Sequence, residues 1–198
     1  MRISSAERKE QLIRATVELM RRDGVQRVTV RRIAEEAGAN LATVSYCFDG
    51  KDDLLRHAFD HWLHRMLDVP PGGSDAAQGL AATIRRIADA YWTDLEESPA
   101  DALAQLEGVI WAVREAPEDE LARSIYDHSA RELAHVFQSA MDASGETSTM
   151  SAQQLAYAFL MLIDGASLQY LADPTNNSYR AVFEQLLELF LAGALREG

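Results

Sequence analysis

The chain of 198 residues is long enough for one or two compact units with a buried core, and its 47% hydrophobic and 25% charged residues describe an ordinary soluble globular protein. A single cysteine excludes an intrachain disulfide and is typical of the reducing cytoplasm. The longest apolar run, residues 155–163, is too short to span a membrane, and no N-terminal stretch resembles a signal peptide. The net charge of −12, taken over the whole chain, argues against nucleic acid as a partner.

Two helices are predicted at the start of the chain. Apolar residues recur at helical spacing over residues 6–23, and Gly24 ends that helix. A shorter helix follows over residues 30–37. Thr29 precedes it and can accept a hydrogen bond from a free amide of its first turn. Gly38 is expected to end it in the left-handed conformation, which glycine adopts at little cost.

A third predicted helix covers residues 41–48, with Asn40 placed to cap it. Val44 and Phe48, four residues apart, would fill the space between the helices. The outward positions are Leu41, Ala42, Thr43, Ser45 and Tyr46. Lys51 begins the next helix, where its ammonium and the free amides can meet a phosphate. Two short helices joined by a tight turn form the layout of a helix-turn-helix, although a generic helical hairpin remains the alternative.

These residues resemble the N-terminal region of the TetR family of transcriptional regulators. The resemblance is carried by residues 28–38, by the short helix that ends in Phe48 and by the helix start at residues 50–55. The positions that match the family pattern are Thr43, Phe48 and Lys51. Ser45 replaces a usual tyrosine, and Cys47 replaces a usual tyrosine or histidine. The DNA contacts of a relative therefore do not transfer unchanged.

The resemblance implies an all-α fold, with a three-helix DNA-binding domain over residues 1–50 and a helical effector-binding and dimerisation domain over residues 51–198. The expected DNA-binding residues are Arg31, Leu41, Ala42, Thr43, Ser45, Tyr46 and Lys51. By family analogy, Thr43 and Lys51 hold phosphates. Polar side chains such as Ser45 can read base edges, and apolar ones such as Leu41 can contact thymine methyl groups.

The acidic residues are concentrated outside the predicted DNA-binding domain. Residues 1–50 hold nine Lys or Arg and seven Asp or Glu, whereas the remainder holds ten and 24. The residues expected to form a local basic surface are Arg2, Arg8, Lys9, Arg27, Arg31, Arg32 and Lys51. The acidic part can face away from DNA, and binding should be strongly salt-dependent.

The rest of the chain has only helical signals, with no strand alternation, internal repeat or low-complexity segment. The predicted helices cover residues 51–69, 75–97, 100–115, 118–143, 151–172 and 178–196. The segment Pro70–Gly73 is the clearest break between them. Ser151 and Gln154 have the spacing of a capping box that would begin the fifth of these helices.

The last two helices carry more apolar residues than one buried face needs. The residues expected at a dimer interface are Leu155, Phe159, Leu162, Val182, Phe183, Leu186 and Phe190. Both helices could instead be inner helices of a monomer. TetR-like proteins dimerise through a two-fold four-helix bundle, and residues 164–166 and 173–174 resemble a subgroup with a BetI-like C-terminal domain. A two-fold dimer would read a palindromic operator in double-stranded DNA.

TetR-like regulators usually bind a small-molecule effector in the helical body. The candidate lining residues are Trp62, Met66, Tyr91, Trp92, Ile110, Trp111, Tyr126, Phe159 and Ile163. Aromatic residues with polar tips suit such a cavity, but each could equally be ordinary core. Asp164 is the polar group most suited to face the cavity; its alternative role is an exposed or capped carboxylate.

Other chemistry has weaker support in the sequence. His57, His61 and His64 share one helix face, yet such rows are common on exposed helices, and we predict neither a metal nor a cofactor. Cys47 is either a redox sensor or a small inward-facing residue. Sequence motifs for phosphate loops and hydrolases are absent, so an enzyme is not expected.

The expected function is therefore a cytoplasmic, homodimeric repressor that an unknown small molecule releases from its operator, with no membrane partner. An effector-independent nucleoid or structural factor of the same fold is one alternative. A non-DNA interaction module, which keeps its basic residues only for packing, is another.

Overall fold

The computed structural model describes residues 4–67, 79–115 and 120–195. Within these ranges the chain is helical, apart from loops, the short 3-10 helix Val25–Arg27 and an isolated bridge between Ser148 and Leu195. The all-α prediction is confirmed. Several predicted features lie outside the described residues: the break at 70–73, the helix starts at 75 and 118, and the helix ends at 69 and 196.

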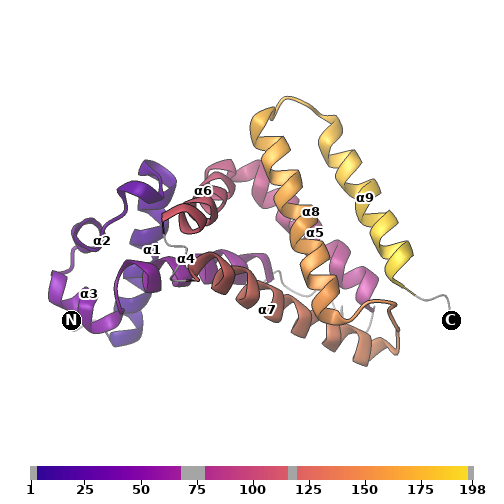
Figure 1. The fold of residues 1–198 in the computed structure, drawn as a ribbon, viewed down its shortest axis with the longest axis horizontal. Helices are drawn as coiled ribbons and strands as arrows, with labels where there is room; N and C mark the ends of the chain where they lie inside the picture. Colours follow the sequence, from indigo (N-terminus) through magenta and orange to yellow (C-terminus); the bar gives the residue numbers. More distant parts are fainter. Residues whose placement is uncertain (1–3, 68–78, 116–119, 196–198) are drawn as a thin grey trace. The chain divides into compact units, whose positions relative to one another are not determined.

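The chain forms two compact units, which we describe separately. Unit 1 comprises residues 1–64 and 100–125, and unit 2 comprises residues 65–99 and 126–198. The helices that contribute to unit 1 are α1 (Ser5–Asp23), α2 (Val30–Glu36), α3 (Leu41–Cys47), α4 (Lys51–Leu67) and α6 (Pro99–Glu115) (Figure 1). Those of unit 2 are α5 (Leu80–Glu97), α7 (Leu121–Ser144), α8 (Ala152–Ala172) and α9 (Ser178–Ala194). The unit boundaries fall inside α4 and near the start of α7.

Short-range hydrogen bonds set the ends of the helices in unit 1. Thr29 accepts from the Arg32 amide at 3.3 Å, and Asn40 accepts from the Thr43 amide at 2.7 Å, as predicted. Gly38 follows α2 with a φ of 57°, the left-handed conformation expected for it. The tight turn between α2 and α3 is thus fixed by local residues and by Gln11 of α1, whose side-chain amide donates to the Ala37 carbonyl at 2.8 Å.

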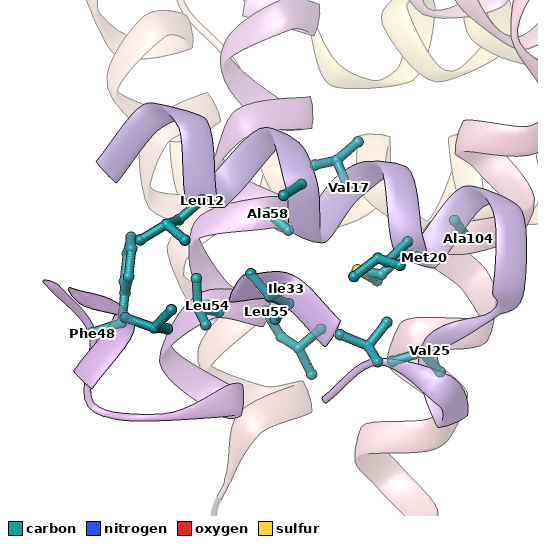
Figure 2. Close-up of a cluster of buried hydrophobic side chains, with 14 of the residues drawn as sticks. Leu12, Val17, Met20, Val25, Ile33, Phe48, Leu54, Leu55, Ala58 and Ala104 are labelled. Atoms are coloured by element: carbon teal, nitrogen blue, oxygen red, sulfur yellow. The ribbon is translucent and has the colours of Figure 1, made fainter. Parts of the chain in front are cut away.

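The core of unit 1 draws side chains from α1, the 3-10 helix, α2, α4 and α6 and from α3 with its C-terminal cap, Phe48 (Figure 2). Leu12, Ile33 and Leu54 are fully buried there, and Phe48 lies beside them. Isolated helices as short as α2 and α3 are unstable in water, so burial of their apolar faces is what holds them.

The compact units do not divide at residue 50, where the sequence suggested a domain boundary. Leu55 and Ala58 of α4, and Ala104 and Ala112 of α6, belong to the same core as the three N-terminal helices. These helices cover apolar surface that α1, α2 and α3 leave open. The helix-turn-helix is therefore part of a larger packing unit.

Unit 2 is a helical bundle in which α8 contacts both α5 and α9 (Figure 1). Ser151 and Gln154 form the predicted capping box at the start of α8. Phe137 of α7 meets Phe159 of α8 edge to face, with ring centroids 6.1 Å apart. Aromatic contacts of this kind tie α7 to α8.

Helix α8 is long enough and apolar enough, by length and composition alone, to cross a membrane. The run at residues 155–163 is too short by itself to span a membrane, but it lies within a 21-residue helix that is apolar on average. Leu155, Phe159 and Ile163 are buried within unit 2, whereas Met161 and Leu168 are exposed. The helix therefore has a core face and a second apolar face.

Substitution of Asn40 by alanine tests the cap that begins α3. We expect the free energy of unfolding to fall by about 1 kcal/mol, because the Thr43 amide loses its acceptor. Aspartate keeps an acceptor in the same place, so Asn40→Asp should stay close to wild type. Urea denaturation measures both variants, and equal stability of Asn40→Ala and wild type would contradict the cap.

Candidate functional site

Helix α3 has one buried and one exposed face. Val44 and Cys47 are buried, whereas 52% of Leu41 and 84% of Tyr46 is exposed. Ala42 and Ser45 are also exposed, and Thr43 is partly exposed. The structure thus places the predicted recognition residues of α3 on one outward surface. Cys47 faces the core, which favours its interpretation as a small inward residue.

The hydroxyl groups of Thr43 and Ser45 on α3 form hydrogen bonds with residues of the same helix or its cap. The Thr43 hydroxyl donates to the Asn40 side-chain oxygen at 2.8 Å, and the Ser45 hydroxyl donates to the Leu41 carbonyl at 3.3 Å. Both hydroxyl oxygens keep lone pairs that can accept hydrogen bonds. Because Ser45 is exposed and short, it can approach a base or backbone group only where α3 lies close to the DNA.

The two arginines of α2 have different surroundings. Arg31 is highly exposed and, within the described residues, its one ion pair is with Glu35 at 3.1 Å, four residues along α2. Arg32 bonds to the Asp23 carboxylate at 2.5 Å and to the Arg27 carbonyl at 3.0 Å. Exposed pairs such as Arg31–Glu35 are weak, so Arg31 can exchange its partner for a phosphate. Arg32 ties α2 to the end of α1.

Lys51 is turned toward the interior of unit 1. Its ammonium donates to the Val25 carbonyl at 3.1 Å and lies 3.9 Å from the centroid of the Trp111 ring. Burial lowers the pKa of the Lys51 ammonium, and Asp52 opposes that shift. The predicted phosphate contact requires this side chain to leave both groups. Trp111, predicted as an effector residue, is here the aromatic partner of a cation.

The nine candidate effector residues do not form one cluster. Trp62, Ile110 and Trp111 belong to unit 1, and the other six belong to unit 2. Trp62 is buried, and its indole N–H has no acceptor among the described residues. Ile110 is 56% exposed. Apolar or aromatic type alone did not distinguish core, surface and cavity positions.

Unit 2 brings three of the candidates together around Asp164. The Tyr126 hydroxyl donates to Asp164 Oδ2 at 2.5 Å. The Tyr91 and Ser167 hydroxyls share a hydrogen bond, and Tyr91 also donates to the Ile163 carbonyl at 3.3 Å. We call Tyr91, Tyr126, Asp164 and Ser167 the tyrosine–aspartate cluster; it joins α5, α7 and α8. Ser167 is the member that sequence reasoning missed, although it lies three residues after Asp164.

The electrostatics of this cluster are set by burial. Burial raises the pKa of the Asp164 carboxyl, and the hydrogen bond from Tyr126 offsets part of the rise. Burial likewise raises the pKa of Tyr91 to about 12. Burial is also the largest cause of the raised pKa of Tyr126, followed by its bond to Asp164. The carboxylate is the costly charged group of the cluster.

A groove of about 350 Å³ on unit 2 lies between α5 and α9. Its apolar lining includes Trp92, which stacks with Phe183 at 5.1 Å between ring centroids. Its charged groups already pair with one another: Arg85 with Glu188, and Arg180 with Asp89, each at 2.6 Å. A ligand in this groove would gain little from those charges.

The predicted interface residues divide between the core and the surface of unit 2. Leu155, Phe159 and Phe183 are buried within the unit, so a second chain cannot contact them directly; this corrects their assignment. The spacing of apolar residues predicts that a helix face is buried, but it does not distinguish burial in the core of the unit from burial against a second chain. Val182 and Leu186 are exposed, and Leu162 and Phe190 are partly exposed. The large exposed apolar residues of α8 and α9 are Tyr157, Met161, Leu168, Val182, Leu186 and Leu189.

The histidine row on α4 has ordinary partners. His57 meets the Phe48 ring edge to face and lies 3.8 Å from Asp53, and His64 lies 3.2 Å from Asp60. In the described part of the chain, no group of three or more His, Cys, Asp or Glu residues is arranged to hold a metal.

A helix-turn-helix with an exposed recognition face, joined to a separate helical unit, defines the class of DNA-binding transcriptional regulators. Residues 12–58 match the family described as bacterial regulatory proteins, tetR family, and residues 80–196 match the BetI-type transcriptional repressor, C-terminal family. The chain is 34% identical over 191 residues to the HTH-type nicotine-responsive transcriptional repressor HdnoR of Paenarthrobacter nicotinovorans, covering 96% of this chain and 97% of that protein.

Solved structures share the fold. A TetR transcription regulator from Haloarcula marismortui ATCC 43049 aligns with a TM-score of 0.71 at 22% identity, covering 96% of this chain and all of that one. The multidrug binding protein EbrR, complexed with imidazole, aligns with a TM-score of 0.65 at 20% identity, covering 93% and 89%. The chain belongs to the TetR family of transcriptional regulators, a class of DNA-binding proteins and not of enzymes.

The Lys51 contacts predict a measurable salt effect. If Lys51 leaves Val25 and Trp111 to bind a phosphate, Lys51→Met should reduce the slope of log K against log salt for DNA binding by about 1. Methionine keeps the apolar stem against the core. Fluorescence anisotropy at several salt concentrations measures the slope, and an unchanged slope would show that Lys51 stays inside unit 1.

Asp164→Asn predicts a pH-dependent gain in stability. The raised pKa of Asp164 means that the folded state binds more protons than the unfolded state, so wild-type stability falls as pH rises from about 4 toward 7. Asparagine lacks this loss and can still accept from Tyr126. We expect its melting temperature to exceed the wild-type value by about 2–4 °C at pH 7, equivalent to about 1 kcal/mol. If the difference in melting temperature between Asp164→Asn and wild type did not grow as the pH rises, the raised pKa of Asp164 would be contradicted.

Proposed function

We propose that this regulator is a homodimeric repressor that binds a palindromic operator through α3 and leaves it when a small molecule binds unit 2. The observation that carries the DNA contact is the outward face of α3, with Leu41 and Tyr46 exposed on a helix anchored by buried Val44. A recognition helix needs this division, because base edges can be reached only by side chains that packing leaves free.

The dimer is supported by the second apolar face of unit 2. Helices α8 and α9 are in contact and both present large exposed apolar residues, Met161 and Leu168 on α8 and Val182, Leu186 and Leu189 on α9. A two-fold pairing of α8 and α9 would bury them in a four-helix bundle. Such a dimer accounts for the apolar character of α8 without a membrane, and we place the protein in the cytoplasm with the DNA it regulates.

Release by an effector is supported by the tyrosine–aspartate cluster and by the relative's name, which describes a nicotine-responsive repressor. Nicotine is therefore the first effector to test. A ligand can release DNA only if it binds one arrangement of the dimer better than the DNA-bound arrangement. The free dimer would hold its recognition helices at the half-site spacing, and the liganded dimer would favour another spacing.

The DNA contact can be tested with two matched arginine substitutions. Arg31→Ala and Arg14→Ala each remove one exposed positive charge that pairs with a glutamate four residues away. We expect Arg31→Ala to weaken binding to a promoter fragment from beside the protein's own gene by about tenfold, and Arg14→Ala by about twofold or less.

Mobility shift at low salt measures both variants, with an unrelated fragment of equal length as the DNA control. Equal effects of the two substitutions would place the DNA surface elsewhere, and no shift with wild-type protein would refute the repressor. Binding to many scattered sites, unaffected by any small molecule, would instead favour a nucleoid factor of the same fold.

A further inference from the structure

Asp164 is the single charged residue of α8, and it lies in the middle of an apolar helix. Its neighbour Ile163 and the nearby Leu160 are buried in unit 2. Asp164 itself is partly exposed, as are Tyr91 and Tyr126. The carboxylate is thus partly withdrawn from water and partly exposed at the surface of unit 2.

The partner of this carboxylate in the described part of the chain is one neutral hydroxyl, that of Tyr126 at 2.5 Å. No Lys, Arg or His of the described residues forms an ion pair with it, whereas the acidic residues around the α5–α9 groove do have arginine partners. A carboxylate that is withdrawn from water without a cation is costly, because its desolvation is then uncompensated. A bound positive charge would supply that compensation at Asp164.

The surroundings of Asp164 suit an organic cation better than a metal ion. The Tyr126 hydroxyl meets the carboxylate, and the Tyr91 hydroxyl bonds to the carbonyl of the neighbouring Ile163, so two tyrosines lie near Asp164. Aromatic rings attract ammonium groups. The Ser167 and Tyr91 hydroxyls supply further polar atoms, but the cluster has only one carboxylate. An anion would be repelled by Asp164, and a neutral ligand would leave its charge unpaired.

We propose that the effector of this regulator is an organic amine, bound as its ammonium form by Asp164 with Tyr126 and Tyr91 beside it. The inference rests on the proposed effector-released function and names the class of effector. Asp164 forms the ion pair, Tyr126 orients the carboxylate, and Tyr91 and Ser167 line the position next to it.

The test compares amines with uncharged analogues of the same shape, led by nicotine and its lactam cotinine and extended to benzylamine with benzamide and other such pairs. Isothermal titration calorimetry on the full-length protein gives the affinities. We expect at least one amine to bind, and Asp164→Asn to weaken that binding by roughly 30-fold or more, with little effect on its uncharged analogue.

Asp127→Asn is the matched control, because Asp127 also accepts from a tyrosine hydroxyl, that of Tyr157 at 3.1 Å in a solvent-exposed bond. It should change amine affinity by about twofold or less. The inference is overturned if no amine in the panel binds more tightly than its uncharged analogue, or if Asp164→Asn binds the amine as wild type does. Thermal melting checks that both variants fold.

A mobility shift on the same samples separates the two proposals. Asp164-dependent amine binding without release of DNA would refute effector release but leave the amine site in place. Release of DNA by a ligand whose binding ignores Asp164 would refute the amine site but leave the effector-released repressor.

Discussion

The recognition surface depends on the burial of one side of a seven-residue helix. A helix of this length is not stable alone, so α3 exists only because Val44 and Cys47 are buried and Phe48 is packed at its end. The same contacts fix the direction of its other side. Exposure of Tyr46 and Leu41 to water costs free energy, because their apolar surface is not buried. The burial of Val44, Cys47 and Phe48 offsets this cost and keeps α3 folded.

The second unit shows the opposite arrangement. There an ionisable group, Asp164, interrupts the most apolar helix of the unit and is held by Tyr126. A helix selected only for packing would carry an apolar residue in that place, and because burial raises the pKa of Asp164, we expect its carboxylate to lower the stability of the unliganded protein. Functional sites commonly retain such destabilising groups, because ligand binding recovers what folding loses.

Sequence reasoning predicted the features that depend on neighbouring residues. The Thr29 and Asn40 caps, the left-handed Gly38 and the Ser151–Gln154 capping box all involve residues at most three apart, and each is present. Periodicity also placed the described helices to within a few residues at their ends.

Contacts between distant residues could not be predicted in this way. The Lys51 ammonium meets the Val25 carbonyl and the Trp111 ring, and the Tyr126 hydroxyl meets Asp164, 38 residues away. Lys51, Trp111, Tyr126 and Asp164 were singled out from the sequence without being paired, and Val25 was not singled out at all. Apolar periodicity marked Leu155 and Phe183 as buried but did not tell a core face from an interface. The size of unit 1 could not be predicted either, because α4 and α6 pack against the N-terminal helices through residues that are distant in sequence.

In the proposed function, DNA binding by α3 and ligand binding in unit 2 are two parts of one coupled equilibrium. Its most direct test is to measure the affinity for the tightest amine with and without saturating operator DNA, and the affinity for operator with and without saturating amine. Thermodynamic linkage requires both affinities to fall by the same factor, and we expect a factor of about 5–150. An amine affinity that does not change when the operator is bound would contradict the account.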